Sequence, residues 1–297
     1  MIVLIHNDME LWDFQIEGLK SRDDFYDIPL SRYCSKLQRL LRKVFHDWHL
    51  PSRFVIGRKL RKVLKELKAG DKVILSDYTA LCLYHAINDS INQDVRVTLW
   101  LWNPIKNNEG LINKIELLKS LNISCCSFDR EDAKKWGLRF LNTFYNLREI
   151  KTIENEDYFN YDFYFLGVAK DRADAISDLQ EKLSAYKCLF IVPSQPSQYI
   201  TYTENIKNVK SSKCIVEIVQ QHQHDITLRP LEAIAYSRKL ITNNIHIKDC
   251  PFYTSDNIFI WGVDRVEKLD DFLNTPYKSL DKKIIEKYDI NYWLDRV

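Results

Sequence analysis

Short apolar runs alternate with helical patterns in the first half of the chain. The runs are rich in β-branched residues and predict buried strands at 2–6, 72–76, 95–102 and 123–128. Apolar residues spaced three and four apart predict helices at 80–88, 111–120 and 129–145. Because strands and helices alternate, we predict a parallel sheet that helices cover on both faces.

The same order restarts in the second half, after a polar stretch at 147–160 that includes the sequence ENED. Strands are predicted at 163–166, 188–192, 214–219, 239–242 and 257–261, and helices at 173–183, 230–237 and beyond 269. We interpret the polar stretch as a linker between two domains, 1–155 and 156–297, with the last helices able to pack back on the first domain. Two Rossmann-like halves imply a cleft between them, which the carboxyl ends of the strands face.

The region from Arg32 to Lys68 is helical in pattern and strongly basic. Its lysines and arginines are accompanied by only two acidic residues, Asp47 and Glu66. Clustered cations attract the anionic headgroups of a membrane surface, and a solvated helical face is the alternative. A nucleic-acid partner is not expected, because the net charge of the 297-residue chain is only +2 and no known nucleic-acid motif is present.

Composition excludes several classes of protein. The seven glycines lie far apart, which excludes a Walker A loop, a GxGxxG fingerprint and a GxSxG nucleophile elbow. The seven cysteines include no CxxC spacing, so neither a zinc ribbon nor a redox motif is expected. No apolar run reaches the roughly 18 residues of a membrane span, and the first residues do not resemble a signal peptide. We therefore expect a cytoplasmic protein with reduced thiols.

The densest polar cluster runs from Glu217 to Glu232, at the junction between a predicted strand and a predicted helix. Pro230 suits the first turn of that helix, and Thr227 is then a candidate N-cap. The free backbone N–H groups of a helix start form an anion site, beside which Arg229 can hold a phosphate in a bidentate contact. Glu232, about one turn further on, can accept hydrogen bonds from the two vicinal hydroxyls of a ribose.

A second candidate anion site lies at the first strand-to-helix turn of the second half. Lys170 and Arg172 occupy this turn, directly after the predicted strand at 163–166. In a parallel sheet, such turns lie at the same edge as the junction that carries Arg229. Together these cations predict a pocket for a diphosphate, with a solvated basic loop as the alternative.

A metal site is a competing interpretation of the loop before the helix at 230–237. His222 and His224 alternate by two, which puts both side chains on one side of an extended segment. Structural zinc needs four ligands, however, and no other His or Cys lies nearby in the sequence. We therefore expect neither a metal nor another cofactor, and we interpret the loop residues, Gln223 among them, as polar groups near a ligand.

In the first half, polar residues follow the predicted strands directly. Asp8 and Asp77 come after the first two strands, where a carboxylate could deprotonate an acceptor hydroxyl as a general base. The structural alternatives are a turn residue for Asp8 and a helix cap for Asp77. Trp102 and Asn103, at the end of the third strand, are candidates for the acceptor side.

The segment QHQHDITLRPLEAIAYSRKLITNN, followed by PFYTSDNIFIWG, resembles bacterial glycosyltransferases of the GT-B class that build capsular polysaccharide, lipopolysaccharide or O-antigen chains. CSFDREDAKKWGLRFLNTFY and DFYFLGVAKDR resemble other stretches of the same group, and the likeness spans about 127–262. The chain also lacks the DxD spacing that is the usual metal-binding signature of the other major sugar-nucleotide fold. One departure is that His224 or Asp225 stands where a glycine would be expected.

The resemblance implies an α/β fold of two Rossmann-like domains, of which the first binds an acceptor and the second a nucleotide sugar. It implies that Thr227 and Arg229 hold phosphate and Glu232 the ribose, with Lys170 and Arg172 nearby. The implied reaction is a metal-independent hexosyl transfer to a bacterial surface glycan or a lipid-linked acceptor at the inner membrane face. A catalytically silent nucleotide- or glycan-binding module is the alternative. We also predict that Arg229→Ala and Glu232→Ala weaken nucleotide binding and leave the fold intact.

Overall fold

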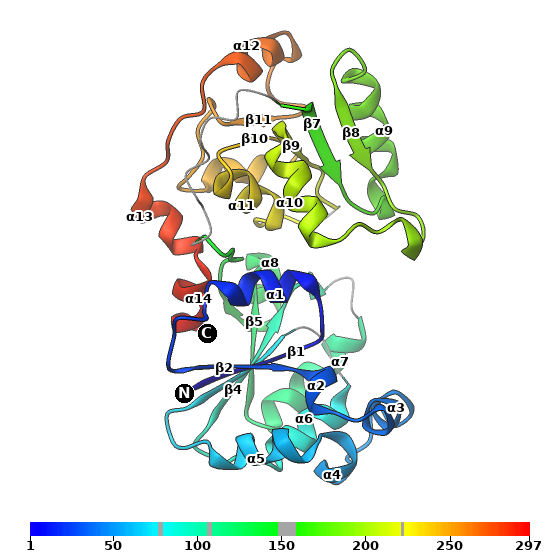
Figure 1. Cartoon of the computed structure of the whole chain (residues 1–297), viewed down its shortest axis with the longest axis vertical. Coiled ribbons are helices and arrows are strands. Elements are labelled where there is room, and N and C mark those ends of the chain that lie inside the picture. The colour runs from blue at the N-terminus through cyan, green and yellow to red at the C-terminus, as the bar shows by residue number, and fades with distance from the viewer. Residues whose placement is uncertain (77–79, 106–108, 148–158, 221–222) are drawn as a thin grey trace. The chain divides into compact units, whose positions relative to one another are not determined.

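The computed structural model describes residues 1–76, 80–105, 109–147, 159–220 and 223–297 (Figure 1). The chain divides into two compact units. The first consists of Met1–Leu141 together with Arg296–Val297, and the second of Asn142–Asp295. The predicted domain boundary between 155 and 156, like most of the predicted linker, lies outside the described residues and stays a prediction.

The first unit contains a six-stranded sheet in which every pair of neighbouring strands is parallel. Its order is β2-β1-β3-β4-β5-β6. The strands are β1 (Ile2–His6), β2 (Phe25–Pro29), β3 (Lys72–Ser76), β4 (Arg96–Leu101), β5 (Ile123–Ser127) and β6 (Arg139–Phe140). The chain passes from β1 to β2 on one side and then to β3 on the other, so the strand order reverses between β1 and β3.

Helices surround this sheet (Figure 1). They are α1 (Glu10–Glu17), α2 (Leu30–Tyr33), α3 (Lys36–Val44), α4 (Ser52–Val55), α5 (Arg58–Glu66), α6 (Leu81–Asn88), α7 (Glu109–Ser120) and α8 (Arg130–Trp136). All five residues of β1 are buried, as are four of the five residues of β3. Because successive strand residues point to opposite faces, both faces of the sheet are covered.

Two predictions for the first unit need correction, and one strand was not predicted. The helix predicted at 129–145 ends at Trp136, because Gly137 adopts the left-handed conformation with φ 62°. The predicted basic helical region consists of four short helices, α2 to α5, with Pro51 and Gly57 directly before the last two. The edge strand β2 was missed because an aspartate and a proline interrupt its apolar pattern.

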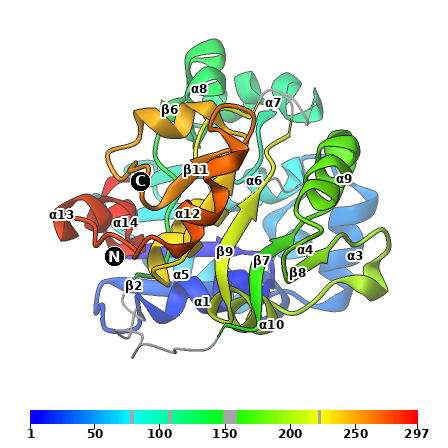
Figure 2. The same ribbon diagram turned by 90° about the horizontal axis from the view of Figure 1, so that it is seen from above.

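The second unit contains a five-stranded sheet that is also wholly parallel, in the order β11-β10-β9-β7-β8. Its strands are β7 (Tyr161–Leu166), β8 (Cys188–Ile191), β9 (Ser212–Glu217), β10 (Lys239–Thr242) and β11 (Ile258–Ile260). Figure 2 shows β7 and β9 side by side, and β7 also pairs with β8. The strand order therefore reverses between β7 and β9.

The helices of the second unit are α9 (Ala173–Lys182), α10 (Tyr202–Lys210), α11 (Leu228–Ala235), α12 (Leu269–Asn274), α13 (Lys282–Ile285) and α14 (Ile290–Arg296). The sequence pattern did not predict α10. The two Rossmann-like parallel sheets confirm the predicted α/β fold class. Within the described residues, no helix combines the length and the apolar character needed to cross a membrane.

Candidate functional site

A cavity of about 260 Å³ lies at the carboxyl ends of β7 and β9. Its lining residues are Phe165, Leu166, Gly167, Arg172, Val216, Glu217, Ile218, Gln220, Gln223, Thr227, Leu228 and Arg229. This is the place where the strand order of the second sheet reverses. In open α/β sheets, ligands bind at such a switch point, outside the carboxyl ends of the strands.

Arg172 follows β7 and its side chain is held by backbone carbonyl groups. Its Nε and one terminal nitrogen donate to Val168 O at 3.2 and 3.0 Å, and the other terminal nitrogen donates to Ile218 O. A Cβ atom on Gly167 would lie 2.6 Å from the Arg172 guanidinium, so a side chain there would displace it. Burial lowers the pKa of Arg172, while the charge of Glu217 opposes this shift. The guanidinium nevertheless stays charged, because arginine is not deprotonated in proteins.

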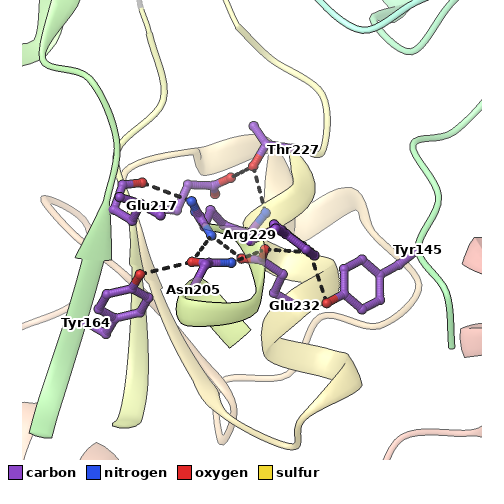
Figure 3. Close-up of polar contacts among 9 residues, drawn as sticks. Tyr145, Tyr164, Asn205, Glu217, Thr227, Arg229 and Glu232 are labelled. Atoms are coloured by element: carbon purple, nitrogen blue, oxygen red, sulfur yellow. Dashed lines mark hydrogen bonds and ion pairs between the residues drawn. The ribbon is translucent and has the colours of Figure 1, made fainter. Parts of the chain in front are cut away.

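Arg229 approaches the cavity from the first turn of α11 (Figure 3). One terminal nitrogen donates to Leu166 O at 3.1 Å. The other donates to Asn205 Oδ1 at 3.0 Å and to the carboxylate of Glu232. Burial alone would lower the pKa of Arg229, but the negative charge of Glu232 raises it. The side chain is 21% exposed, so it is anchored at its inner side and reaches the cavity wall.

Glu232 lies behind Arg229 and is not among the residues that line the cavity. Its side chain is fully buried. Besides the contact with Arg229, its Oε1 accepts hydrogen bonds from Asn205 Nδ2 at 2.9 Å and from Tyr202 at 3.0 Å. The Tyr202 hydroxyl also lies 3.1 Å from that of Tyr145. In this arrangement the carboxylate holds Arg229 in place; the predicted contact with ribose hydroxyls stays a prediction.

Thr227 is the N-cap of α11, as the sequence predicts. Its hydroxyl oxygen accepts a hydrogen bond from Arg229 N at 3.2 Å and donates to the carboxylate of Glu217. Thr242 donates to the other carboxylate oxygen of Glu217 at 2.6 Å. Burial raises the pKa of Glu217, although both threonines and the neighbouring Arg229 favour its charged form. Glu217 was not predicted as a site residue, although it begins the polar cluster at the end of a predicted strand.

The remaining predicted donor residues differ in position. Gln223 lines the cavity. Lys170 does not: it is exposed and adopts a left-handed backbone conformation with φ 48°. His224 stacks edge-on against His246, with ring centroids 5.0 Å apart, and His222 lies outside the described residues. In the part of the chain that the structure describes, no group of three or more His, Cys, Asp or Glu side chains could hold a metal ion.

The residues predicted in the first unit lie after its strands. Asp8 is exposed, and its carboxylate accepts hydrogen bonds from Ser31 N at 3.2 Å and Ser31 Oγ at 2.5 Å. Asp77 lies outside the described residues. Trp102 packs edge-on against Trp12, with centroids 5.4 Å apart, and Asn103 is exposed. Asp8 therefore supports the start of α2 in this structure, and its role as a base stays a prediction.

Two larger cavities, of about 490 and 590 Å³, lie in the first unit. They share five lining residues, Gln93, Asp94, Val95, Val97 and Asn122. These residues surround the amino ends of β4 and β5. Ligands of parallel sheets bind at the opposite, carboxyl ends, so we assign the candidate site to the smaller cavity.

The sequence matches no protein-family model and no curated protein. The structure, however, is similar to solved glycosyltransferase structures. Anabaena HepE in complex with UDP is 9% identical, with a TM-score of 0.57, over 99% of this chain and 97% of that one. AviGT4, a glycosyltransferase involved in avilamycin A biosynthesis, is 8% identical, with a TM-score of 0.57, over 100% and 95% of the chains.

An α-glucosyltransferase in complex with UDP-glucose and DNA containing an abasic site is 11% identical, with a TM-score of 0.53, over 99% and 92% of the chains. At such low identity, these likenesses establish the fold alone. They identify it as the GT-B-like fold that the resemblance implied.

Proposed function

We propose that the protein transfers a sugar from a nucleotide-sugar donor to an acceptor hydroxyl. The cavity at the carboxyl ends of β7 and β9 carries this proposal, because two arginines converge on it. A guanidinium has five N–H donors, and each arginine uses three of them in its bonds within the described residues. The remaining donors are available to a diphosphate, for which charge-assisted contacts with arginine are well suited.

The likeness to structures that contain UDP or UDP-glucose supports a nucleotide sugar as the donor. In this proposal Arg172 and Arg229 hold the diphosphate, and Thr227, the N-cap of α11, and Gln223 lie beside it. Lys170 lies in an exposed turn and does not line the cavity, so its side chain would have to extend from this turn to contact the same anion. Glu232 positions Arg229 in the structure. The predicted contact of Glu232 with ribose hydroxyls would require its carboxylate to give up its buried hydrogen bonds with Tyr202, Asn205 and Arg229.

Charge stabilisation is the main catalytic effect that we propose. As the acceptor oxygen attacks the anomeric carbon, the bond from that carbon to the diphosphate oxygen breaks and negative charge develops on the leaving group. Two preorganised guanidinium groups stabilise this charge without the help of a metal ion. The proton of the acceptor hydroxyl passes to a base, for which Asp8 and Asp77 remain the candidates.

The acceptor side belongs to the same proposal. We place Trp102 and Asn103 at the acceptor and infer a bacterial surface glycan or a lipid-linked glycan as its class. A cytoplasmic enzyme at the inner face of the membrane would meet both a nucleotide sugar and a lipid-linked acceptor. The basic region between Arg32 and Lys68 supports attraction to an anionic surface.

Calorimetric titration with UDP, GDP, CMP and dTDP tests the donor site. We expect one of these nucleotides to bind, and Arg172→Gln to weaken its binding about tenfold or more through the loss of charge-assisted hydrogen bonds. Lys182→Gln, on the exposed side of α9, is the matched control and should bind as the unmodified chain does. Equal affinity of the Arg172 variant would overturn the proposed site. Binding without turnover of the matching nucleotide sugars would instead favour a silent binding module.

A further inference from the structure

The helix α3 presents three of its four apolar residues to solvent, while the fourth, Leu41, is half-buried. None of its nine residues is buried. Leu37, Leu40 and Val44 follow the spacing of one helical stripe and are 63%, 56% and 63% exposed. Trp48 continues the same stretch of chain beyond the helix and is 64% exposed. A surface helix of a globular protein ordinarily buries this stripe against the core, so α3 is oriented the opposite way.

Polar side chains fix this orientation. Gln38 Nε2 donates to Arg53 O and Ile56 O, both at 2.9 Å. Arg42 donates to Val55 O at 3.0 Å, from the same side of the helix. Gln38 also closes a capping box with Ser35 at the start of α3. The polar side is therefore bonded to α4 and its flanks, and the helix cannot turn its apolar stripe inward without breaking these bonds.

Cations border the exposed stripe. Lys36, Arg39 and Lys43 are all exposed on α3. At 100° per residue they follow one another along one side of the stripe. None of the three forms an ion pair within the described residues. The neighbouring acidic residue Asp47 is engaged by Lys114 at 3.0 Å and by His46 at 2.8 Å.

The charge pattern selects among the occupants of such a surface. A second copy of this chain would bring the same three cations against one another, which disfavours pairing through this face. An anionic bilayer, by contrast, offers negative headgroups beside an apolar interior. Short helices with an apolar face and basic residues lie in this interface, with the apolar face in the acyl boundary and the cations at the headgroups. Exposed tryptophan is typical of the same level of the membrane.

We propose that the α3 face, defined as Leu37, Leu40, Val44 and Trp48 with Lys36, Arg39 and Lys43, is a docking surface for an anionic lipid bilayer. The apolar stripe enters the acyl boundary and the three cations contact headgroup phosphates. This proposal goes beyond attraction by the basic region, because it requires the uncharged stripe as well. It does not depend on the donor site, which lies in the other unit.

Sedimentation with lipid vesicles tests the proposal on the full chain. Vesicles of equal parts phosphatidylcholine and phosphatidylglycerol should bind the protein, and vesicles of phosphatidylcholine alone should bind it much more weakly. Replacement of Leu37 and Leu40 by Gln should weaken binding to the anionic vesicles at least about tenfold, because the apolar contribution is lost. The matched control replaces Val263 and Val266, each 47% exposed in the second unit, by Gln and should bind unchanged.

Charge and depth give two further measurements. Replacement of Lys36, Arg39 and Lys43 by Gln should weaken binding about a hundredfold. When anionic vesicles are added, the tryptophan emission of the unmodified protein should shift to the blue. The Trp48→Phe variant should not show this shift. Far-UV circular dichroism verifies that each variant is folded.

Three results would overturn the proposal. The first is a lack of binding of the unmodified protein to anionic vesicles. The second is equal binding of the Leu37 and Leu40 variant, which would mean that charge alone attracts the chain, as it would to any polyanion. The third is a dimer, seen by light scattering, that the same variant makes monomeric, because the face would then be an interface between two copies.

Discussion

Arg229 links the candidate donor site to a fully buried carboxylate. A buried ion pair is weak evidence for stability as long as both partners are present, but removing one partner leaves an uncompensated buried charge. Glu232 would keep Asn205 and Tyr202 as donors and lose its cation. At this position binding and stability are therefore coupled, which the sequence alone could not show.

Arg229→Ala is expected to destabilise the protein as well as weaken nucleotide binding. This revises the expectation from sequence, by which the fold would stay intact. The free energy of unfolding should fall by about 3–5 kcal/mol, because Glu232 stays buried without its cation. Urea denaturation measures the change. The paired variant Arg229→Met with Glu232→Leu removes both charges and should recover most of the loss; an Arg229→Ala variant as stable as the unmodified chain would contradict the interpretation.

Glu217 makes stability depend on pH. Its pKa is raised by burial, so between the ordinary value and the raised one the native state binds more protons than the unfolded state. In this window stability falls as pH rises, and the loss persists at higher pH. We expect the free energy of unfolding of Glu217→Gln, relative to the unmodified chain, to increase from about pH 4 towards neutral pH. Denaturation at several pH values tests this, with exposed Glu181→Gln as control; a difference that stays constant or declines would refute it.

At the scale of single elements, the strands that position the site were predicted from sequence and several helices were not. The runs of apolar residues in β3, β7 and β10 reflect burial on both faces of the sheet. This signal does not depend on which strands lie beside them. The helix α10 escaped prediction, and it supplies Asn205 and Tyr202 to the network behind Arg229. That Arg172, Thr227 and Arg229 lie at one cavity follows from their places after strand ends, whereas the burial of Glu232 depends on these unseen partners.

The basic helices depend on a close approach at Gly57. A Cβ atom there would lie 2.0 Å from Tyr33 O, and Gly57 N donates to the same carbonyl at 3.1 Å. Gly57→Ala should therefore force α2 and α5 apart and lower the free energy of unfolding by about 1–3 kcal/mol. Thermal denaturation measures the effect, with Lys59→Ala on the exposed side of α5 as control. An unchanged midpoint of thermal denaturation would show that Tyr33 moves aside without a loss of stability.

At the scale of the whole molecule, the two units are not two simple halves of the chain. Arg296 and Val297 belong to the first unit. Val297 is 1% exposed, its carbonyl oxygen accepts a hydrogen bond from Lys72 Nζ at 2.9 Å, and Arg296 O accepts one from Arg139. The chain thus returns to its first sheet after completing the second, a feature that no local sequence pattern encodes.

Val297→Ala should destabilise the first unit, although Val297 lies far in the sequence from the strands of that unit. The lost burial of two methyl groups corresponds to about 1–2 kcal/mol. Hydrogen exchange measures this locally: amide groups of β1 and β3 should exchange faster, and those of β7 and β9 should not. Val263→Ala, at an exposed position of the second unit, should leave both sets unchanged. Faster exchange confined to β7 and β9 would count against this division of the chain.

Because Arg296 and Val297 belong to the first unit, this unit is completed only after the second unit has been translated. When Leu141 emerges, the nascent first unit still lacks the two residues that accept hydrogen bonds from Lys72 and Arg139, and the whole second unit is translated before they arrive. The first unit therefore lacks the contacts of Arg296 and Val297 for as long as the second unit is being translated. Removal of Arg296 and Val297 would therefore weaken the first unit and not the one that holds the two arginines.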